Sequence, residues 1–224
     1  VWPLVKNWPT AWREHDGRSY KFFEKERVVL VCGGMGAEAA RRAAEAMISL
    51  YHPVLVISAG FAGGLDPSLP VGHTLNPRQV IDACDGSRVD SGSGEGVLVT
   101  FETAADAGQK AKLATAFGAH AVDMEAAAVA RSAEAHGIKF LACKVISDPH
   151  DSRLPPIMRF VGPDGRFDAA GFLLHVAIRP WLWRGVVQLA RNSSVAARTL
   201  CEALGGTTSE AAEQAADMLV GAKT

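Results

Sequence analysis

The chain has 224 residues, 48% of them apolar, and a formal net charge of −1 at pH 7. This length and composition predict one globular domain over residues 1–224, with enough apolar side chains for a sizeable core. The near-neutral charge argues against a nucleic-acid partner, and no apolar run has the length that crosses a bilayer.

The four cysteines are widely scattered, with no spacing typical of a metal site. Cys32 and Cys143 fall inside predicted strands, so we expect them to be buried free thiols in a reducing compartment. No signal peptide is recognised at the start of the sequence. These observations favour a cytoplasmic protein.

The first third of the chain predicts a strand, a glycine turn and a helix. Residues 1–24 contain three tryptophans and two prolines, which favours a short helix or loop followed by a strand near Ser19–Phe23. Arg27–Gly33 is apolar enough for a buried strand, and it leads through Gly34, Met35 and Gly36 into a helix over Ala37–Leu50. Such a turn can bind an anion through the free N–H groups of the first helical turn. A plain tight turn explains the same pattern.

The middle of the chain alternates between predicted strands and loops. Pro53–Ala59 is a predicted strand, followed by a glycine-rich segment that begins at Gly60 and Phe61. Further expected elements are strand-like sequence at 71–82, a loop at 85–96, a strand at 96–101 and an amphipathic helix at 106–117 that turns Lys110 and Lys112 to water.

Ala121–Asp148 holds two carboxylates in unusual places. An alanine-rich helix is predicted over Asp123–His136 and a buried strand over Ile138–Ile146. In that helix Glu125 shares the small apolar face of Ala128, Val129 and Ala133, where an unpaired carboxylate is unfavourable. Asp148 follows the strand, at the end where open α/β sheets bind ligands. A structural role for Glu125 and a turn-capping role for Asp148 remain alternatives.

The last third, residues 149–224, predicts a lid loop and C-terminal helices. Residues 149–166 are rich in proline, and two helices split by Pro180 follow, with a final helix at 209–220. The apolar stretch that includes Trp181 and Trp183 can pack on the core, form a dimer face, line a channel for a long substituent or touch a membrane surface.

The segment Val122-Asp123-Met124-Glu125-Ala126-Ala127, followed by Val145-Ile146-Ser147-Asp148, resembles the signature pair of the nucleoside phosphorylase and nucleosidase superfamily. The resemblance covers residues 27–148 by motif order and spacing. It implies a three-layer α/β/α sandwich around a mixed, twisted sheet. It also implies cleavage of a purine nucleoside, without a metal or an organic cofactor and in a homo-oligomer.

The resemblance also implies roles for individual residues. Asp148 would protonate N7 of the leaving base if burial keeps its carboxyl protonated, and Glu125 would bind the ribose hydroxyls and stabilise the oxocarbenium charge. The family's water-activating acid lies on an opening strand that is not among these residues, so we cannot assign it. Further substrate contacts are expected at Met124, Met35, Gly60, Phe61, Phe101 and Ser147, and a phosphate co-substrate at Gly34 and Gly36.

Three functions compete. The C-terminal apolar stretch resembles the hopanoid-associated phosphorylase branch, whose implied substrate is a purine nucleoside with a hydrophobic tail. A methylthioadenosine/S-adenosylhomocysteine nucleosidase is the second reading. The third is an inactive nucleoside-binding relative, supported by the missing opening strand and by Phe61, which replaces a small hydroxyl residue. No phosphate-clamping arginine precedes Phe61, which argues against phosphorolysis.

Overall fold

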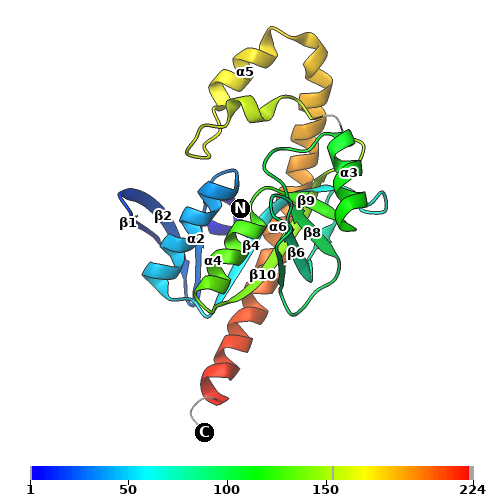
Figure 1. Ribbon diagram of the computed structural model, residues 1–224. Helices are drawn as coiled ribbons and strands as arrows, with labels where there is room; N and C mark the ends of the chain where they lie inside the picture. The colour runs from blue at the N-terminus through cyan, green and yellow to red at the C-terminus, as the bar shows by residue number, and fades with distance from the viewer. Residues whose placement is uncertain (1, 153, 222–224) are drawn as a thin grey trace.

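The computed structural model describes residues 2–152 and 154–221, with side chains described as far as residue 206. Its centre is a seven-stranded sheet in the order β5-β10-β4-β9-β8-β6-β7 (Figure 1). The sheet is mixed, because among the described residues three of its strand pairs are parallel and three are antiparallel. The strands are β4 (Leu55–Gly64), β5 (Thr74–Leu75), β6 (Gln79–Asp82), β7 (Arg88–Asp90), β8 (Val97–Thr100), β9 (Ala121–Asp123) and β10 (Lys139–Asp148).

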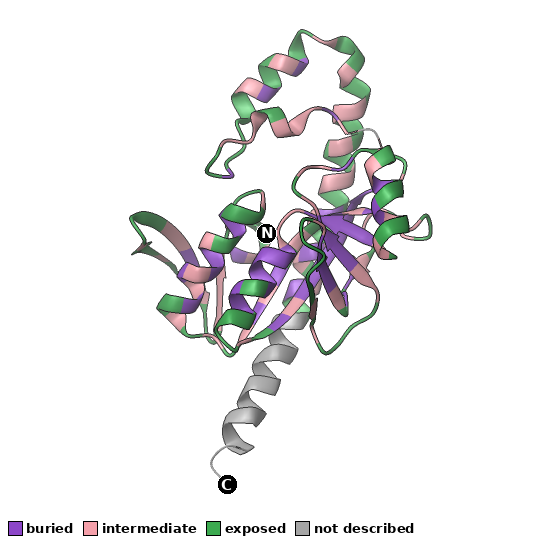
Figure 2. Ribbon diagram, in the orientation of Figure 1, coloured by how far each residue is buried: buried purple, intermediate pink, exposed green. Residues whose placement is uncertain are grey.

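Helices cover both faces of this sheet and complete the three layers. On one face, α2 (Ala37–Tyr51) and α4 (Ala126–Ala135) share a core with β4 and β10, built largely from alanines. On the other face, α6 (Pro180–Gly221) packs Leu200 and Leu204 against Val145 of β10. The predicted α/β/α sandwich is therefore confirmed, and Figure 2 shows the buried residues concentrated in the central sheet and α4.

A second sheet of three antiparallel strands stands beside the first, after the short helix α1 (Trp2–Val5). It contains β1 (Thr10–His15), β2 (Arg18–Lys25) and β3 (Val28–Val31). Asp16 and Gly17 both have positive φ in the β1–β2 turn, the geometry that matches the twist of a hairpin. The prediction of a fully buried strand at 27–33 is wrong, because β3 is half-buried and its following Cys32 is exposed.

Two boundaries near the presumed site also differ from the prediction. The glycine-rich segment after Ala59 is not a loop, because β4 continues to Gly64 by pairing with β10 and finally with β9. The helix predicted from Asp123 begins only at Ala126, because Asp123 is the last residue of β9 and Glu125 precedes α4. Both changes bring backbone of the central sheet into the site.

The helix α3 (Ala107–Phe117) has the predicted bounds. Asp106 and Gln109 form a reciprocal capping box at its start, and Gly118 ends it in the left-handed conformation. Lys112 is exposed as predicted, but Lys110 is 1% exposed and turns into the protein. The predicted loop at 85–96 also contains the short strand β7.

The C-terminal part begins with a loop that contains a single 3-10 turn, η1 (Ile157–Phe160). Helix α5 (Ala169–Ala177) and the start of α6 then form a helical hairpin at one end of the molecule (Figure 1). The final helix predicted at 209–220 is a continuation of α6. In the described part of the chain, no helix combines the length and apolarity needed to span a membrane.

Candidate active site

A cavity of about 1040 Å³ lies between the two sheets. Its walls include β3 and the edge of β4 that faces away from β10. Among the described residues, β3 pairs only with β2, and this edge of β4 pairs only with β9, at Gly63 and Gly64. Because the cavity follows a strand edge, it reaches side chains on both faces of the central sheet. Its volume is at the upper limit of ordinary small-molecule sites.

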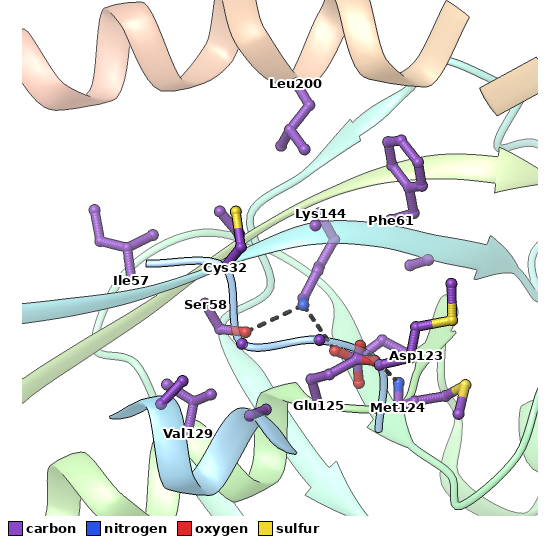
Figure 3. Close-up of a pocket in the computed structure, with 18 of the residues that line it drawn as sticks. Cys32, Ile57, Ser58, Phe61, Asp123, Met124, Glu125, Val129, Lys144 and Leu200 are labelled. Carbon is purple, nitrogen blue, oxygen red and sulfur yellow. Dashed lines mark hydrogen bonds and ion pairs between the residues drawn. The ribbon is translucent and has the colours of Figure 1, made fainter. Parts of the chain in front are cut away.

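One end of the cavity is built around a buried lysine. Lys144 of β10 is 1% exposed, and its Nζ lies 2.8 Å from Asp123 Oδ2 and donates to Ser58 Oγ at 3.1 Å (Figure 3). The other Asp123 oxygen accepts a hydrogen bond from Thr100 Oγ1 at 2.7 Å. Each charge in this pair therefore has a partner, which burial of both groups requires.

Glu125 lies next to this pair and lines the cavity. Its Oε1 accepts the Gly36 N–H at 2.9 Å, and its Oε2 accepts the Met124 N–H at 3.3 Å. Burial raises the pKa of Glu125, and the charge of Asp123 raises it further. The Lys144 ammonium opposes this rise. Each carboxylate oxygen keeps lone pairs that can accept a hydrogen bond from a sugar hydroxyl.

The glycine turn before α2 already has protein partners for two of its N–H groups. Gly36 donates to Glu125, and Met35 donates to the Gly165 carbonyl at 2.8 Å. Phosphate binding at Gly34 and Gly36 stays a prediction, and at Gly36 it would require Glu125 to move. In this structure the turn fixes the orientation of the Glu125 carboxylate.

Asp148 ends β10 and forms the second charged pair of the cavity. Lys110 Nζ contacts Asp148 Oδ2 directly and also donates to the Pro149 carbonyl at 2.7 Å. The hydroxyls of Ser147 and Ser152 donate to the two Asp148 oxygens at 2.8 and 2.9 Å. These contacts fix the position of the Asp148 carboxylate at the end of β10.

Gly63 of β4 makes room for this pair. A Cβ at Gly63 would lie 3.0 Å from Lys110 Cε and 3.1 Å from Asp148 Oδ2, which is closer than side chains normally pack. At Gly60, three residues earlier, the nearest atom would be Lys144 Nζ at 3.6 Å, an ordinary contact. A side chain at position 63 would therefore clash with this pair, whereas a Cβ at position 60 would not.

Most of the predicted site residues meet in this cavity. The lining residues include Gly34, Met35, Gly60, Phe61, Met124, Glu125, Ser147 and Asp148. Phe101 does not line it, because its ring packs against the buried cluster of Leu65 and Val99. Thr103 of the same loop reaches the cavity instead. Gly36 lies behind the lining and acts through its N–H on Glu125.

Sequence reasoning missed Lys110 and Lys144. Lys144 had a visible signal, since it interrupts an otherwise apolar buried strand, where a lone charge requires a partner. Lys110 had no such signal, because a lysine on an amphipathic helix normally faces water. Within the described ranges, no group of three or more potential ligand side chains gathers to hold a metal ion.

The rest of the cavity is lined mainly by apolar side chains. Val28–Val31 of β3 and Ile57 of β4 line it, together with side chains from the C-terminal helices, among them Phe172, Val186, Leu189 and Leu200. Figure 3 shows Leu200 and Ile57 away from the cluster of Ser58, Asp123 and Glu125. The site therefore joins a charged end to a long apolar extension.

Comparison with known proteins shows which family the chain resembles. The model of the Phosphorylase superfamily matches residues 5–111 and 95–158. A 5′-methylthioadenosine/S-adenosylhomocysteine nucleosidase of Marinomonas sp. (strain MWYL1) is 35% identical over 82 residues, covering 35% of this chain and 36% of that protein. The enzyme of that name from Treponema pallidum (strain Nichols) is 28% identical over 178 residues, covering 54% of this chain and 66% of that protein.

Solved structures show the same fold at low identity. The Helicobacter pylori 5′-methylthioadenosine/S-adenosylhomocysteine nucleosidase with butyl-thio-DADMe-Immucillin-A has a TM-score of 0.65 and 16% identity, covering 93% of this chain and 92% of that one. Futalosine hydrolase of Helicobacter pylori strain 26695 has a TM-score of 0.57 and 18% identity, covering 65% and 78%. At these identities the likeness concerns the fold alone.

Proposed function

The chain belongs to the Phosphorylase superfamily, and we propose that it cleaves the N-glycosidic bond of a purine nucleoside and releases the base. The observation that carries the proposal is the charged end of the cavity, where Glu125 and Asp148 arrive from two different strand ends. Two carboxylates suit this reaction, because the leaving base needs a proton and the sugar develops positive charge.

Glu125 takes the sugar side of the reaction in this proposal. Its two oxygens are held by the N–H groups of Gly36 and Met124, so its orientation is fixed before substrate arrives. A carboxylate held in place stabilises a developing cation without reorganising during the reaction. Met124 lines the cavity beside it and supplies apolar contact for the ribose.

Asp148 takes the base side. N7 of a purine is an acceptor, so Asp148 has to carry a proton when it meets the base. In this proposal Asp148 delivers the proton to N7, and the Lys110 Nζ in direct contact with Asp148 is the group that replaces that proton. Ser147 and Ser152 hold the carboxylate in position during this transfer.

The apolar extension of the cavity favours a nucleoside with a hydrophobic 5′ substituent, as in the hopanoid-associated branch. A site of about 1040 Å³ with this lining is larger than a nucleoside alone requires. A methylthioadenosine/S-adenosylhomocysteine nucleosidase is the second candidate, favoured by the names of the two curated relatives. We take water as the nucleophile, because two N–H groups of the glycine turn are already used within the protein. Gly36 donates to Glu125 and Met35 donates to the Gly165 carbonyl, so neither is available to a phosphate.

The test is base release measured by liquid chromatography from adenosine, methylthioadenosine and an adenosine with a long alkyl 5′ substituent. Each substrate is run with and without inorganic phosphate. We expect release without phosphate and the highest kcat/KM for the alkyl substrate. A strict requirement for phosphate contradicts hydrolysis, and a preference for methylthioadenosine selects the second candidate.

Inactivity is a distinct outcome of the same experiment. If adenosine binds in a calorimeter but no substrate releases its base, the chain is a nucleoside-binding relative without catalysis. The variants Glu125→Gln and Asp148→Asn test the two roles, since each keeps the size of its side chain, removes the charge and replaces one accepting oxygen by a donating amide group. Full activity in either variant contradicts the role given to that residue.

A further inference from the structure

The helical hairpin of α5 and the start of α6 exposes large apolar side chains on its outer side. The exposed fractions are 63% for Leu173, 69% for Leu174, 66% for Ile178, 73% for Trp181, 51% for Trp183 and 49% for Val187. We call these six residues the hairpin surface. Large exposed apolar groups of this kind mark interaction sites rather than ordinary protein surface.

The charge of the same segment is strongly one-sided. Residues 169–201 contain four arginines, at 179, 184, 191 and 198, and no aspartate or glutamate. Because the whole chain has a formal charge of −1, the remaining residues together carry −5. In the described residues Arg184, Arg191 and Arg198 make no ion pair, so their charges are available to a partner.

Both tryptophans of the hairpin surface are exposed. Trp183 donates its Nε1–H to the Val176 carbonyl at 3.0 Å, which fixes the ring while leaving half of it exposed. Trp181 is the most exposed member of the hairpin surface. Tryptophan beside arginine and leucine is the composition of segments that lie in the plane of a membrane interface.

We propose that the hairpin surface docks this protein on an anionic lipid bilayer, with Trp181 and its apolar neighbours in the interface and the arginines on lipid phosphates. A second copy of the chain is a poorer occupant. A two-fold contact places the same surface on both partners, so it would face Arg179 and Arg184 with their own copies, and residues 169–201 offer no acidic group to either.

The inner side of the hairpin supports this orientation. Phe172, Val186 and Leu189 line the apolar part of the cavity, whereas none of the six residues of the hairpin surface lines it. Docking would place the apolar end of the cavity near the lipid. A hydrophobic substituent could then pass from the bilayer to the site, a consequence that rests on the proposed function, whereas the docking itself does not.

The test is vesicle co-sedimentation of the full chain with phosphatidylcholine alone and with equal parts of phosphatidylcholine and phosphatidylglycerol. We expect binding to the anionic vesicles, weakening at high salt as the arginines are screened. Trp181→Ala should reduce this binding at least tenfold. Trp12→Ala is the matched control, because Trp12 is 66% exposed on β1 and far from the hairpin in sequence.

The charge contribution is tested separately. Arg184→Gln and Arg191→Gln should each weaken binding by about fivefold, the effect of one basic residue near an anionic surface. Arg18→Gln, an exposed arginine of β2, should have no effect. Circular dichroism and adenosine cleavage without lipid check that the hairpin variants remain folded.

Two results would overturn the proposal. One is absence of binding to anionic vesicles by the parent chain. The other is a parent dimer that Trp181→Ala dissociates, together with equal vesicle binding by both proteins, which would assign the hairpin surface to a second copy. Base release in lipid-free solution is measured in parallel, so failure of docking and failure of the nucleoside-cleaving function remain distinguishable.

Discussion

The two ends of the cavity are built on different principles. At the charged end, Asp123, Lys144, Asp148 and Lys110 form two buried pairs, and the described residues contain no buried side-chain nitrogen or oxygen without a hydrogen-bond partner. At the apolar end, aliphatic side chains of β3, β4 and α6 line an open strand edge. The charged end holds its side chains in place by hydrogen bonds and ion pairs, whereas the apolar end is defined mainly by the volume that its side chains leave open.

This difference separates catalysis from selectivity. A charged group that loses its partner in a buried site is strongly unfavourable, so the charged end tolerates little change. An apolar wall discriminates by fit, and one methylene more or less changes selectivity only moderately. We therefore expect substitutions at the charged end to abolish the reaction, and substitutions at the apolar end to change which substrate is preferred.

The largest expected effects are on the rate of base release, and they should differ between variants at the two ends of the cavity. Glu125→Gln and Asp148→Asn should each lower kcat for base release by about 10²- to 10⁴-fold. Leu189→Ala at the apolar end should change kcat/KM for the alkyl-substituted substrate by about 10- to 200-fold and leave adenosine cleavage nearly unchanged. Steady-state kinetics on both substrates measure the contrast. If Leu189→Ala lowered kcat/KM equally for adenosine and for the alkyl-substituted substrate, the apolar end would not determine selectivity.

The next effect concerns stability at the charged end. Lys144→Met leaves Asp123 buried without its counter-ion, so the free energy of unfolding should fall by about 3–5 kcal/mol. Adding Asp123→Asn should restore part of this loss, because the uncompensated charge is then absent. Urea denaturation of both variants measures the free energy of unfolding, and Lys112→Met is the control because Lys112 is exposed. A double variant no more stable than Lys144→Met would show that the pair is not the cause.

A smaller effect distinguishes two glycines of the same strand. Gly63→Ala forces Lys110 and Asp148 apart, so we expect a loss of about 1–3 kcal/mol from overpacking and up to about 10²-fold in base release from misplacement of Asp148. Gly60→Ala meets only an ordinary contact and should be far milder. Similar effects at both positions, by urea denaturation and kinetics, would contradict the steric role of Gly63.

The smallest effect is a pH dependence that comes from Glu125. Its pKa is raised above 4.5 in the folded protein, so the folded state binds more protons than the unfolded state between 4.5 and the raised value. The free energy of unfolding contributed by Glu125 should therefore fall as pH rises through that window. Base release should rise there, because the ionised carboxylate stabilises the sugar cation.

Urea denaturation at a series of pH values measures the stability side of this dependence. Glu125→Gln should flatten the slope in that window, since the amide does not titrate. Glu134→Gln is the matched control, because Glu134 is exposed on α4. An unchanged slope in Glu125→Gln would assign the pH dependence to other groups.

Much of the fold could be predicted from the sequence because its signals are local. The capping box at Asp106 and Gln109 and the glycine after α3 fix that helix without help from the rest of the chain. The apolar run of β10 and the break at Pro149 mark the strand that delivers Asp148. The meeting of Glu125 and Asp148 in one cavity was expected from the resemblance of their two motifs to the signature pair of the superfamily.

The remaining differences arise from strand pairing, which local sequence does not encode. Glycines 60, 63 and 64 resemble a loop in isolation, yet β10 and β9 hold them in an extended strand. The apolar residues of β3 resemble a central strand, yet they pair with the β1–β2 hairpin in a separate sheet. Phe101 resembles a base-stacking residue, yet its neighbours place it in a core cluster.

The sequence by itself determined the order of most elements, because helices and strands depend on periodicity and caps. Its two motifs, through their resemblance to the superfamily, implied the three-layer fold and the roles of the two carboxylates. Only the tertiary structure decided which groups those carboxylates contact. Lys110 and Gly36 come from distant segments, and their contacts with Asp148 and Glu125 exist only after the sheets and helices have packed. The physical reason is that a charge pair is a long-range contact, specified by geometry that no single segment contains.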